Sequence, residues 1–489
     1  MQEKKNNIIR TRFAPSPTGF LHIGGLRTAL YSYLYAKKHN GAFLLRIEDT
    51  DQARNVQGAV DNLINTLNWA GITFDEGPGK EGSFGPYIQS QRLDLYKKYT
   101  EQLISEKHAY YCFCSSERLD QLRQKQIAQK LPPAYDRHCR NIDPIIALEK
   151  TKSEPFVVRM KVPLTGEITF NDLIRGKITI AYKNIDDQII LKSDGFPTYH
   201  LAVVVDDKLM EISHVIRGEE WLPSTPKHLL LYEYFGWHAP EFAHLPLLLN
   251  PDRSKLSKRQ GDVAVEDYRK KGFLPEALVN FVALLGWNPG DEREIFSLNE
   301  LVEAFSFAHV HKAGAVFDVT KLEWMNGLYL HKKTNTEILE LIKLNIDPEF
   351  ETKLSLLKHE QILILINLYK DKFKVLSDLA QIIITLDQAP SEYEANGLEQ
   401  FVTPETCQYL TQLIEKLKAT EWNLNDLTTM IKSLVKELNI KFPNMAQPIR
   451  LALTGTITSP GIYEMLVAFG KDESLNRLTT FLKFISNKN

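Results

Sequence analysis

The 489 residues are 43% apolar and carry a formal net charge of −2, which excludes a strongly basic nucleic-acid-binding protein, so nucleic acid would have to bind local basic patches. This much apolar sequence can build several cores, and we expect two to four domains. The polar N-terminus and the lack of any apolar run near the roughly 18 residues of a membrane span predict a cytoplasmic protein that does not enter membranes.

The first segments of the chain alternate as in a parallel α/β domain. Residues 8–13 form a short apolar strand candidate, PSPTG interrupts it, and a helical pattern follows with Leu26, Leu30 and Leu34 on one face. Asn40-Gly41 is typical of a left-handed helix end. The run AFLLRI predicts a second buried strand, and the polar residues 48–51 predict the start of a helix that continues to Gly71.

The middle of the chain predicts a domain inserted into that sheet. Residues 87–194 are first helix-rich and basic and then contain short strand candidates at 157–162 and 178–182. The apolar runs Leu201–Asp207 and Leu245–Leu249 have buried-strand character, which indicates a return to the parallel sheet. The first domain would then comprise residues 1–86 and 195–330. Residues 331–489 have helical spacing nearly throughout and predict an all-helical module.

The string PSPTGFLHIGG, residues 15–25, lies at the predicted turn between the first strand and the first helix. Ligands of open parallel sheets bind beyond the carboxyl ends of the strands, where helix N-termini attract phosphate. His22 can donate a hydrogen bond to a phosphate oxygen there, and Gly24 leaves room for a flat base against the backbone. By itself, the string also fits an ordinary glycine-rich turn.

The string KLSKR, residues 255–259, follows the Leu245–Leu249 run and a Pro-Asp turn. Two lysines in such a loop can close on a triphosphate and stabilise the leaving pyrophosphate in the transition state. By itself, a short basic loop is usually solvated surface.

Together, in this order, the two strings resemble the HIGH and KMSKS motifs of class I aminoacyl-tRNA synthetases. TRFAPSPTG, RIEDTD, DGFPTYHLA and VIRGEEW are similar to the glutamyl subgroup, and the resemblance covers the whole chain. It implies a Rossmann-like parallel sheet catalytic domain with an inserted α/β acceptor-binding domain, followed by an all-α anticodon-binding module. Two positions depart from the motifs: Gly25 replaces the fourth HIGH residue, and Arg259 replaces the fifth KMSKS residue.

The resemblance implies a role for each matching position. The amino-acid pocket would be lined by Arg12, Ser16, Glu48, Tyr199 and Arg217. ATP would be bound by Thr18, His22, Gly24, Glu220, Lys255, Ser257, Lys258 and Arg259, with His22, Lys255 and Lys258 stabilising charge during catalysis. A carboxylate such as Glu48 suits the substrate ammonium, and arginines suit carboxylates, although each residue alone also fits an ordinary salt bridge. Arg217, assigned to the side-chain carboxylate, has Glu219 and Glu220 as alternative partners.

The resemblance also implies the reaction and its partners. L-Glutamate would be activated by ATP, which carries Mg²⁺, to glutamyl-adenylate and then transferred to tRNA(Glu) by a monomeric enzyme, with activation requiring tRNA. Lys372, in YKDKF, stands where the resemblance places an arginine in enzymes that reject the glutamine anticodon. The sequence settles neither this discrimination nor the oligomeric state. A small-molecule adenylate-forming ligase would have no use for the helical module, and a non-catalytic tRNA-binding paralogue would be expected to lose His22 or Lys258.

The cysteines leave a metal site open. The four cysteines, Cys112, Cys114, Cys139 and Cys407, are too unevenly distributed for a secreted disulfide framework. Some bacterial members of the subgroup bind zinc through Cys-x-Cys and a later Cys-x-His, and the first three cysteines match that pattern. The fourth position is Asn141, a poor zinc ligand, with His138 nearby as a substitute. The sequence does not decide between a zinc site and a vestigial thiol cluster.

Overall fold

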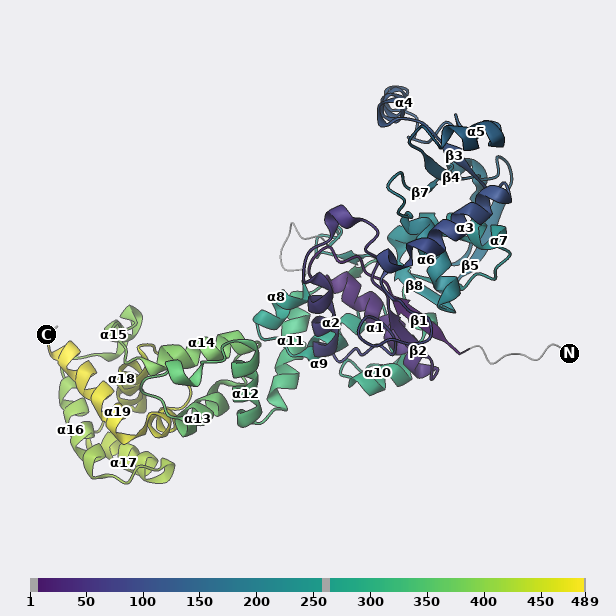
Figure 1. Cartoon of the computed structure of the whole chain (residues 1–489). Helices are drawn as coiled ribbons and strands as arrows, with labels where there is room; N and C mark the ends of the chain where they lie inside the picture. The colour runs from purple at the N-terminus through teal and green to yellow at the C-terminus, as the bar shows by residue number, and fades with distance from the viewer. Residues whose placement is uncertain (1–7, 257–263, 488–489) are drawn as a thin grey trace. The chain divides into compact units, whose positions relative to one another are not determined.

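The central sheet of the chain contains six strands in the order β2-β1-β8-β9-β5-β6. Figure 1 labels β1, β2, β5 and β8 of this sheet. The computed structural model describes residues 8–256 and 264–487. The strands are β1 Arg10–Phe13, β2 Ala42–Leu45, β5 Glu167–Asp172, β6 Gly176–Ala181, β8 His214–Gly218 and β9 Glu241–Leu245. The first five strands in this order pair in parallel, and only β6 is antiparallel to its neighbour. The predicted parallel α/β sheet is confirmed.

The first helix, α1 Ile23–Lys38, follows β1 as predicted and buries Leu26, Leu30 and Leu34. It ends where Asn40 adopts a left-handed φ of 51°, so the asparagine rather than Gly41 makes the turn. The helix expected from residue 48 to Gly71 is shorter. One 3₁₀ turn covers Gln52–Arg54, and α2 covers Ala59–Trp69, because Gly58 separates them with a φ of 77°.

The run Leu201–Asp207 was expected to be a strand, and that prediction was wrong. These residues lie in helix α6, Tyr199–Leu209, and all seven are buried. The helix packs against α3 Leu93–Ser105 and α7 Thr225–Tyr234. A helix covered on nearly every side lacks a polar face, so its apolar run looks like that of a buried strand. The second run, Leu245–Leu249, is divided between β9 and the two-residue strand β10 Leu248–Leu249.

The stretch expected to be an inserted domain contributes to two sheets. A separate antiparallel sheet contains β3 Ala109–Cys112, β4 Val157–Met160 and β7 Ile189–Leu191, and α4 Ser116–Ala128 and α5 Pro144–Lys150 lie between β3 and β4 in the chain. The β5–β6 hairpin between β4 and β7 instead extends the central sheet, with Asp172 opposite Phe242 of β9. Residues 87–194 therefore do not form one sheet apart from the catalytic one.

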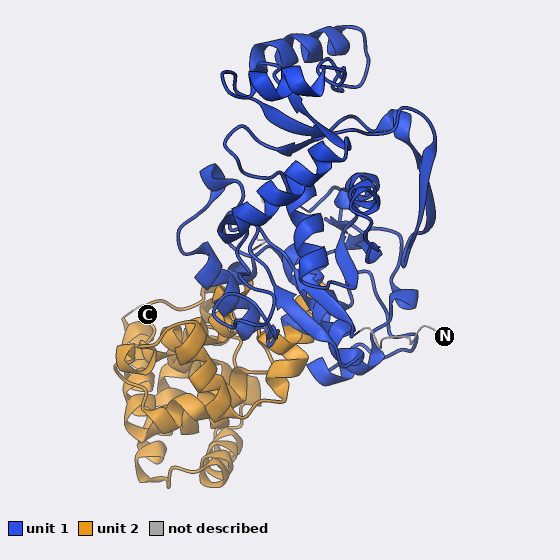
Figure 2. Cartoon of the chain, turned by 45° about the vertical axis from the view of Figure 1, so that its right-hand side comes forward, with its two compact units in different colours: residues 1–267, 278–318 blue, residues 268–277, 319–489 orange. Residues whose placement is uncertain are grey.

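The chain divides into two compact units (Figure 2). The first comprises residues 1–267 and 278–318, and the second comprises residues 268–277 and 319–489. The segments near this division contain α8 Val265–Lys270, α9 Pro275–Ala283, α10 Leu298–Ala304 and β11 Ala315–Val316. The helical part of the second unit begins at Val319, twelve residues before the expected boundary at 331.

The regular elements of the second unit are all helical within its described residues, as predicted. Residues 268–277 contribute the end of α8 and the start of α9. From residue 319 onward the α-helices are α11 Val319–His331, α12 Asn335–Asn345, α13 His359–Tyr369, α14 Leu376–Asp387, α15 Ala395–Phe401, α16 Thr406–Ala419, α17 Leu424–Glu437, α18 Phe442–Thr454 and α19 Ile462–Ser486, with a kink in α19 at Gly470. Among the described helices, none is both long and apolar enough to cross a membrane.

Candidate active site

A cavity of about 790 Å³ lies beside the carboxyl ends of β1 and β8 and the first residues of α1. This is where an open parallel sheet is expected to bind a ligand. The cavity brings together nine residues that the sequence singled out. They are Arg12, Ser16, Thr18, His22, Gly24, Glu48, Tyr199, Arg217 and Glu220.

The KMSKS-like string is only partly described. The side chain of Lys255 is exposed and does not line the cavity, and its backbone forms a bridge with Leu249. Ser257, Lys258 and Arg259 lie outside the described residues. Among the described residues, the lining of the cavity includes the HIGH-like string, the ends of β1 and β8, and residues of other segments such as Arg54 and Tyr199.

His22 is the N-cap of α1, and its ring accepts a hydrogen bond at Nδ1 from the backbone N–H of Gly24, at 3.0 Å. In a neutral imidazole the other nitrogen, Nε2, then carries the proton and can donate it. A side chain at Gly24 would place its Cβ 3.3 Å from Nδ1. The glycine thus leaves the histidine in this orientation at the positive end of the helix dipole.

One wall of the cavity is a buried ionic cluster. Arg12 pairs with Asp207 at 3.0 Å, and Arg46 pairs with Asp207 at 2.7 Å and with Glu48 at 3.0 Å. Burial acts to raise the pKa of Asp207, but the guanidinium groups of Arg12 and Arg46 outweigh it and lower that pKa. Burial raises the pKa of Glu48 in spite of Arg46. The sequence predicts that Arg12 binds a substrate carboxylate, but in the structure Arg12 already pairs with the carboxylate of Asp207.

The cavity is also lined by Arg217, which is 5% exposed. Its Nε donates to His244 Nε2 at 3.0 Å, and its Nη2 donates to Thr225 Oγ1 at 2.9 Å. Its Nη1 contacts Tyr199 Oη at 2.9 Å and His228 Nδ1 at 3.2 Å. Within the described chain, no carboxylate lies at ion-pair distance from this arginine.

The groups around Arg217 are electrically neutral. Burial, followed by the charge of Arg217, lowers the pKa of His228 well below its ordinary value, and burial also lowers the pKa of His244. Burial raises the pKa of Tyr199. The two acidic residues weighed as alternative partners do not pair with Arg217 in the described structure, and Glu219 instead pairs with Arg175. Sequence reasoning did not identify His228, His244 or Thr225, which belong to none of the strings used.

The arginines of the cavity differ in their partners. Arg12 pairs with Asp207, and Arg54 pairs with Asp51, whereas Arg217 has only neutral partners in the described residues. Removing a cation from water is costly unless a counter-charge or hydrogen bonds offset it. Arg217 is therefore a buried cation prepared for a negative group from outside the chain.

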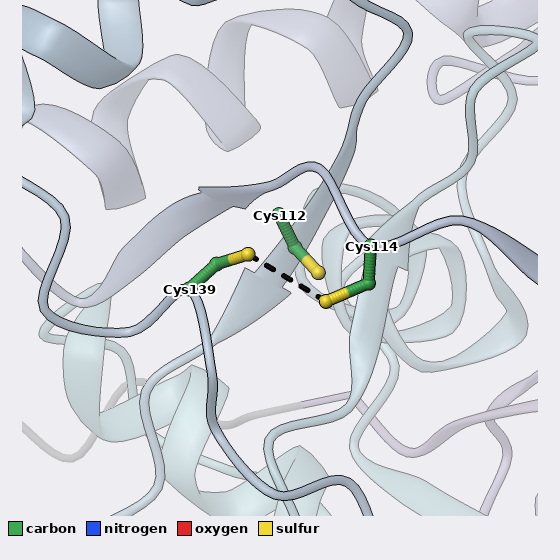
Figure 3. A group of neighbouring side chains, drawn as sticks. All are labelled: Cys112, Cys114 and Cys139. Carbon is green, nitrogen blue, oxygen red and sulfur yellow. Dashed lines mark hydrogen bonds between the residues drawn. The ribbon is translucent and has the colours of Figure 1, made fainter. Parts of the chain in front are cut away.

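The thiol groups of Cys112, Cys114 and Cys139 converge at the end of β3 (Figure 3), with all three sulfur atoms within 4.8 Å of one another. Cys114 Sγ and Cys139 Sγ are 3.6 Å apart. The hydroxyl of Tyr135 lies 3.3 Å from Cys112 Sγ and 3.5 Å from Cys114 Sγ.

These residues fit three of the four ligand positions of a structural zinc ion. Both sequence candidates for the fourth position, Asn141 and His138, are exposed, and the described cluster contains no histidine. Besides the Tyr135 hydroxyl, Arg118 Nη1 lies 3.5 Å from Cys114 Sγ and Arg159 Nε lies 3.3 Å from Cys112 Sγ. A zinc ion here would be held by the three thiolates and would stabilise the end of the small antiparallel sheet.

Residues 8–324 match the family model for the catalytic domain of class I tRNA synthetases (E and Q), and residues 330–482 match an anticodon-binding domain. The chain belongs to this family of class I tRNA synthetases.

Two curated relatives define its place further. A glutamate–tRNA ligase of Chlorobium chlorochromatii is 47% identical, with 98% of each chain covered. That of Alkaliphilus metalliredigens is 46% identical, with 96% of this chain and 98% of the relative covered. A crystal structure of a glutamate tRNA ligase from Elizabethkingia meningosepticum, in complex with its amino acid, is 37% identical, with a TM-score of 0.89 over 98% of this chain and 100% of that one. Within the class, the chain is thus a member of the glutamate–tRNA ligase family.

Proposed function

We propose that this chain ligates L-glutamate to tRNA(Glu) for translation, in two steps through glutamyl-adenylate, with release of AMP and diphosphate. The observation that carries the proposal is Arg217, a buried cation with neutral partners in the cavity at the N-terminus of α1. A site that combines a cation for a carboxylate with a helix N-terminus for phosphate suits the joining of an acidic amino acid to a nucleotide.

In this proposal, two groups of cavity residues bind opposite ends of the amino acid. Glu48 receives the ammonium group, since its carboxylate lines the cavity and keeps only Arg46 as a direct ion-pair partner among the described residues. Arg217 and the Tyr199 hydroxyl receive the side-chain carboxylate. Arg12 and Ser16 line the space between, and the pairing of Arg12 with Asp207 gives it a fixed position from which to contact the substrate.

The nucleotide lies against the HIGH-like string in this proposal. Nε2 of His22 donates to a phosphate oxygen, and Thr18, Gly24 and Glu220 complete the ATP contacts. The loop with Lys255, Ser257, Lys258 and Arg259 contributes positive charge as pyrophosphate leaves. Mg²⁺ enters with ATP and neutralises part of the phosphate charge. No side-chain nucleophile is needed, so catalysis is mainly positioning and electrostatics.

The remaining steps involve tRNA. A hydroxyl of the terminal ribose attacks the carbonyl of the adenylate, and AMP leaves. Residues 1–86 and 195–330 carry the chemistry, residues 87–194 hold the acceptor end, and residues 331–489 bind the anticodon with Lys372 close to it. We place the reaction in the cytoplasm and assign it to a monomer.

ATP–pyrophosphate exchange tests the proposal, with glutamate and with glutamine, each with and without tRNA(Glu). We expect exchange with glutamate only when tRNA is present and much weaker exchange with glutamine. Robust exchange without tRNA would contradict the required role of tRNA. No exchange under any condition, with tRNA binding retained, would support the non-catalytic paralogue instead.

A further inference from the structure

A chain of buried polar groups leads from Arg217 through His244 to Asp172 at the end of β5. His244, on β9, accepts at Nε2 from Arg217 Nε at 3.0 Å. Its other ring nitrogen, Nδ1, lies 2.6 Å from Oδ2 of Asp172, the last residue of β5. Both residues are buried, with exposed fractions of 1% for Asp172 and 0% for His244. The pairing of β5 with β9 brings them together.

The hydrogen bonds of Asp172 determine which nitrogen of His244 carries the proton. Oδ1 of Asp172 accepts from the backbone N–H groups of Ile174 at 3.0 Å, Arg175 at 2.8 Å and His244 at 3.4 Å. Oδ2 is left to accept from His244 Nδ1, which must therefore be protonated. The neutral imidazole then has its lone pair on Nε2, where the N–H of Arg217 requires an acceptor.

The interposed imidazole also preserves the charge of Arg217. A carboxylate in direct contact would satisfy the same N–H but would compete with a substrate carboxylate for the guanidinium. The His244 ring lies between Asp172 and Arg217, so the carboxylate does not contact the guanidinium directly. Of the five N–H groups of a guanidinium, four are taken by His244, Tyr199, His228 and Thr225 within the described structure, which leaves one on Nη2.

We propose that Asp172 and His244 are positioning residues for amino-acid selection. They orient the guanidinium plane of Arg217 through the tautomer of His244, so that its remaining N–H meets the side-chain carboxylate of glutamate. This inference rests on the proposed function, since it assumes that Arg217 binds that carboxylate.

The substitution Asp172→Asn tests the tautomer. The amide oxygen of the new side chain is held by the backbone N–H groups of residues 174, 175 and 244, so its NH₂ group must face His244 Nδ1. His244 then has to accept at Nδ1 and carry its proton on Nε2, where it faces the N–H of Arg217. Losing such a charge-assisted hydrogen bond should raise the KM for glutamate roughly tenfold to a hundredfold. The KM for ATP should stay the same, and the preference for glutamate over glutamine should fall.

Two further variants separate positioning from a merely structural role. In His244→Gln the amide oxygen can accept from Arg217 without help from Asp172, so Asp172→Asn added to that variant should cause little further loss of preference. Asp387→Asn is the matched control, because Asp387 is also buried and accepts backbone hydrogen bonds from residues 355–357. It should lower the melting temperature without changing the ratio of glutamate to glutamine use.

Each outcome has one interpretation, provided that wild-type exchange is measured alongside. Wild-type protein that does not use glutamate overturns the proposed function. Wild-type activity with glutamate, combined with unchanged KM and preference in Asp172→Asn, overturns the positioning role alone. Equal additional losses from Asp172→Asn with and without His244→Gln would also overturn it, because the effect would not pass through the histidine.

Discussion

At the scale of single residues, the charged side chains of the cavity differ in whether they already have an ion-pair partner within the protein. Arg12 forms an ion pair with Asp207, and Glu48 forms one with Arg46. Those side chains are therefore held in place before any ligand binds. Arg217 is held equally well, but by neutral acceptors. Hydrogen bonds from a cation to neutral groups fix its geometry while leaving most of its charge for a ligand.

The substitution Arg217→Gln removes that charge. A buried guanidinium facing glutamine has no counter-charge, a mismatch of about 3–5 kcal/mol by analogy with a broken buried ion pair. In the variant, kcat/KM for glutamate should fall by roughly two to three orders of magnitude, while use of glutamine stays level or rises. tRNA-supported exchange with both amino acids measures this. Equal loss of both activities, with a lowered melting temperature, would make Arg217 structural.

Arg293→Gln serves as the control for that experiment. Arg293 forms an exposed pair with Asp291, and exposed pairs contribute about 0–1 kcal/mol. Its removal should leave both exchange rates and the melting temperature close to those of the wild type.

The substitution Lys258→Ala tests the basic loop. In the proposed function its charge stabilises the departing pyrophosphate, and losing a contact made in the transition state costs about 3 kcal/mol, on the order of a hundredfold in rate. The rate of adenylate formation should fall far more than the affinity for ATP, which single-turnover kinetics over a range of ATP concentrations can separate. An unchanged kcat with a raised KM for ATP would rule out the transition-state role. Lys312→Ala, at an exposed lysine elsewhere in the first unit, is the comparison.

At the scale of helices and strands, the sequence predicted elements well where local signals were strong. The β1 strand, the PSPTG turn and α1 follow from alternation, a breaker and helical spacing. Helix α6 was predicted as a strand because its seven buried residues have no polar side to reveal the helical period. The β5–β6 hairpin was assigned to an insertion because strand pairing depends on contacts between distant residues, such as Asp172 and Phe242.

The ionic cluster joins β1, the residues that follow β2, and α6, so it should contribute to stability. Asp207→Asn leaves the buried Arg12 without a carboxylate partner among the described residues. It also removes one carboxylate from the buried Arg46, which keeps its pair with Glu48. The free energy of unfolding at neutral pH should fall by roughly 3 kcal/mol, measured by urea denaturation of the full chain. Glu149→Gln, at an exposed pair with Lys152, should change it by less than about 1 kcal/mol.

The pH dependence of that difference gives a second readout. Because the two arginines lower the pKa of Asp207, its carboxylate stabilises the fold fully above the ordinary aspartate value of about 4. The stabilisation disappears as the pH falls through the lower folded value, where the protonated side chain resembles asparagine. The wild type and variant should therefore converge only in strong acid. A difference that persists there would have a cause other than charge.

At the scale of the whole molecule, the motif strings predicted the class of synthetase and a set of pocket positions. They could do so because the residues of each string are neighbours in the sequence and belong to the same site. Nine of the predicted positions line one cavity. The neutral partners of Arg217 come from β9, α6 and α7, and only the folded chain brings those elements together. Contacts of this kind have no local sequence signal. The division of the chain is equally non-local, because residues 268–277 fold with the second unit.

The second unit contains the residues that match an anticodon-binding domain, and within it Lys372 lies exposed in the connection between α13 and α14. Its backbone N–H donates to Tyr369 O at 2.8 Å, and its Nζ lies 5.5 Å from the centre of the Tyr369 ring. An ammonium group provides charge without the planar fork with which arginine contacts the edge of a base at two points. We therefore expect the wild type to discriminate weakly between tRNA(Glu) and tRNA(Gln).

Lys372→Arg restores the fork and should raise discrimination. A two-point contact with a base distinguishes it from the wrong base by about 1–3 kcal/mol, so the ratio of kcat/KM for tRNA(Glu) to that for tRNA(Gln) should increase roughly fivefold to a hundredfold. Charging of each purified tRNA with glutamate measures the ratio. Lys353→Arg, at an exposed lysine that pairs with Asp347, makes the same chemical change elsewhere in the second unit and should leave the ratio unaltered. Complete rejection of tRNA(Gln) by the wild type would show that lysine at position 372 suffices for discrimination and would overturn the prediction.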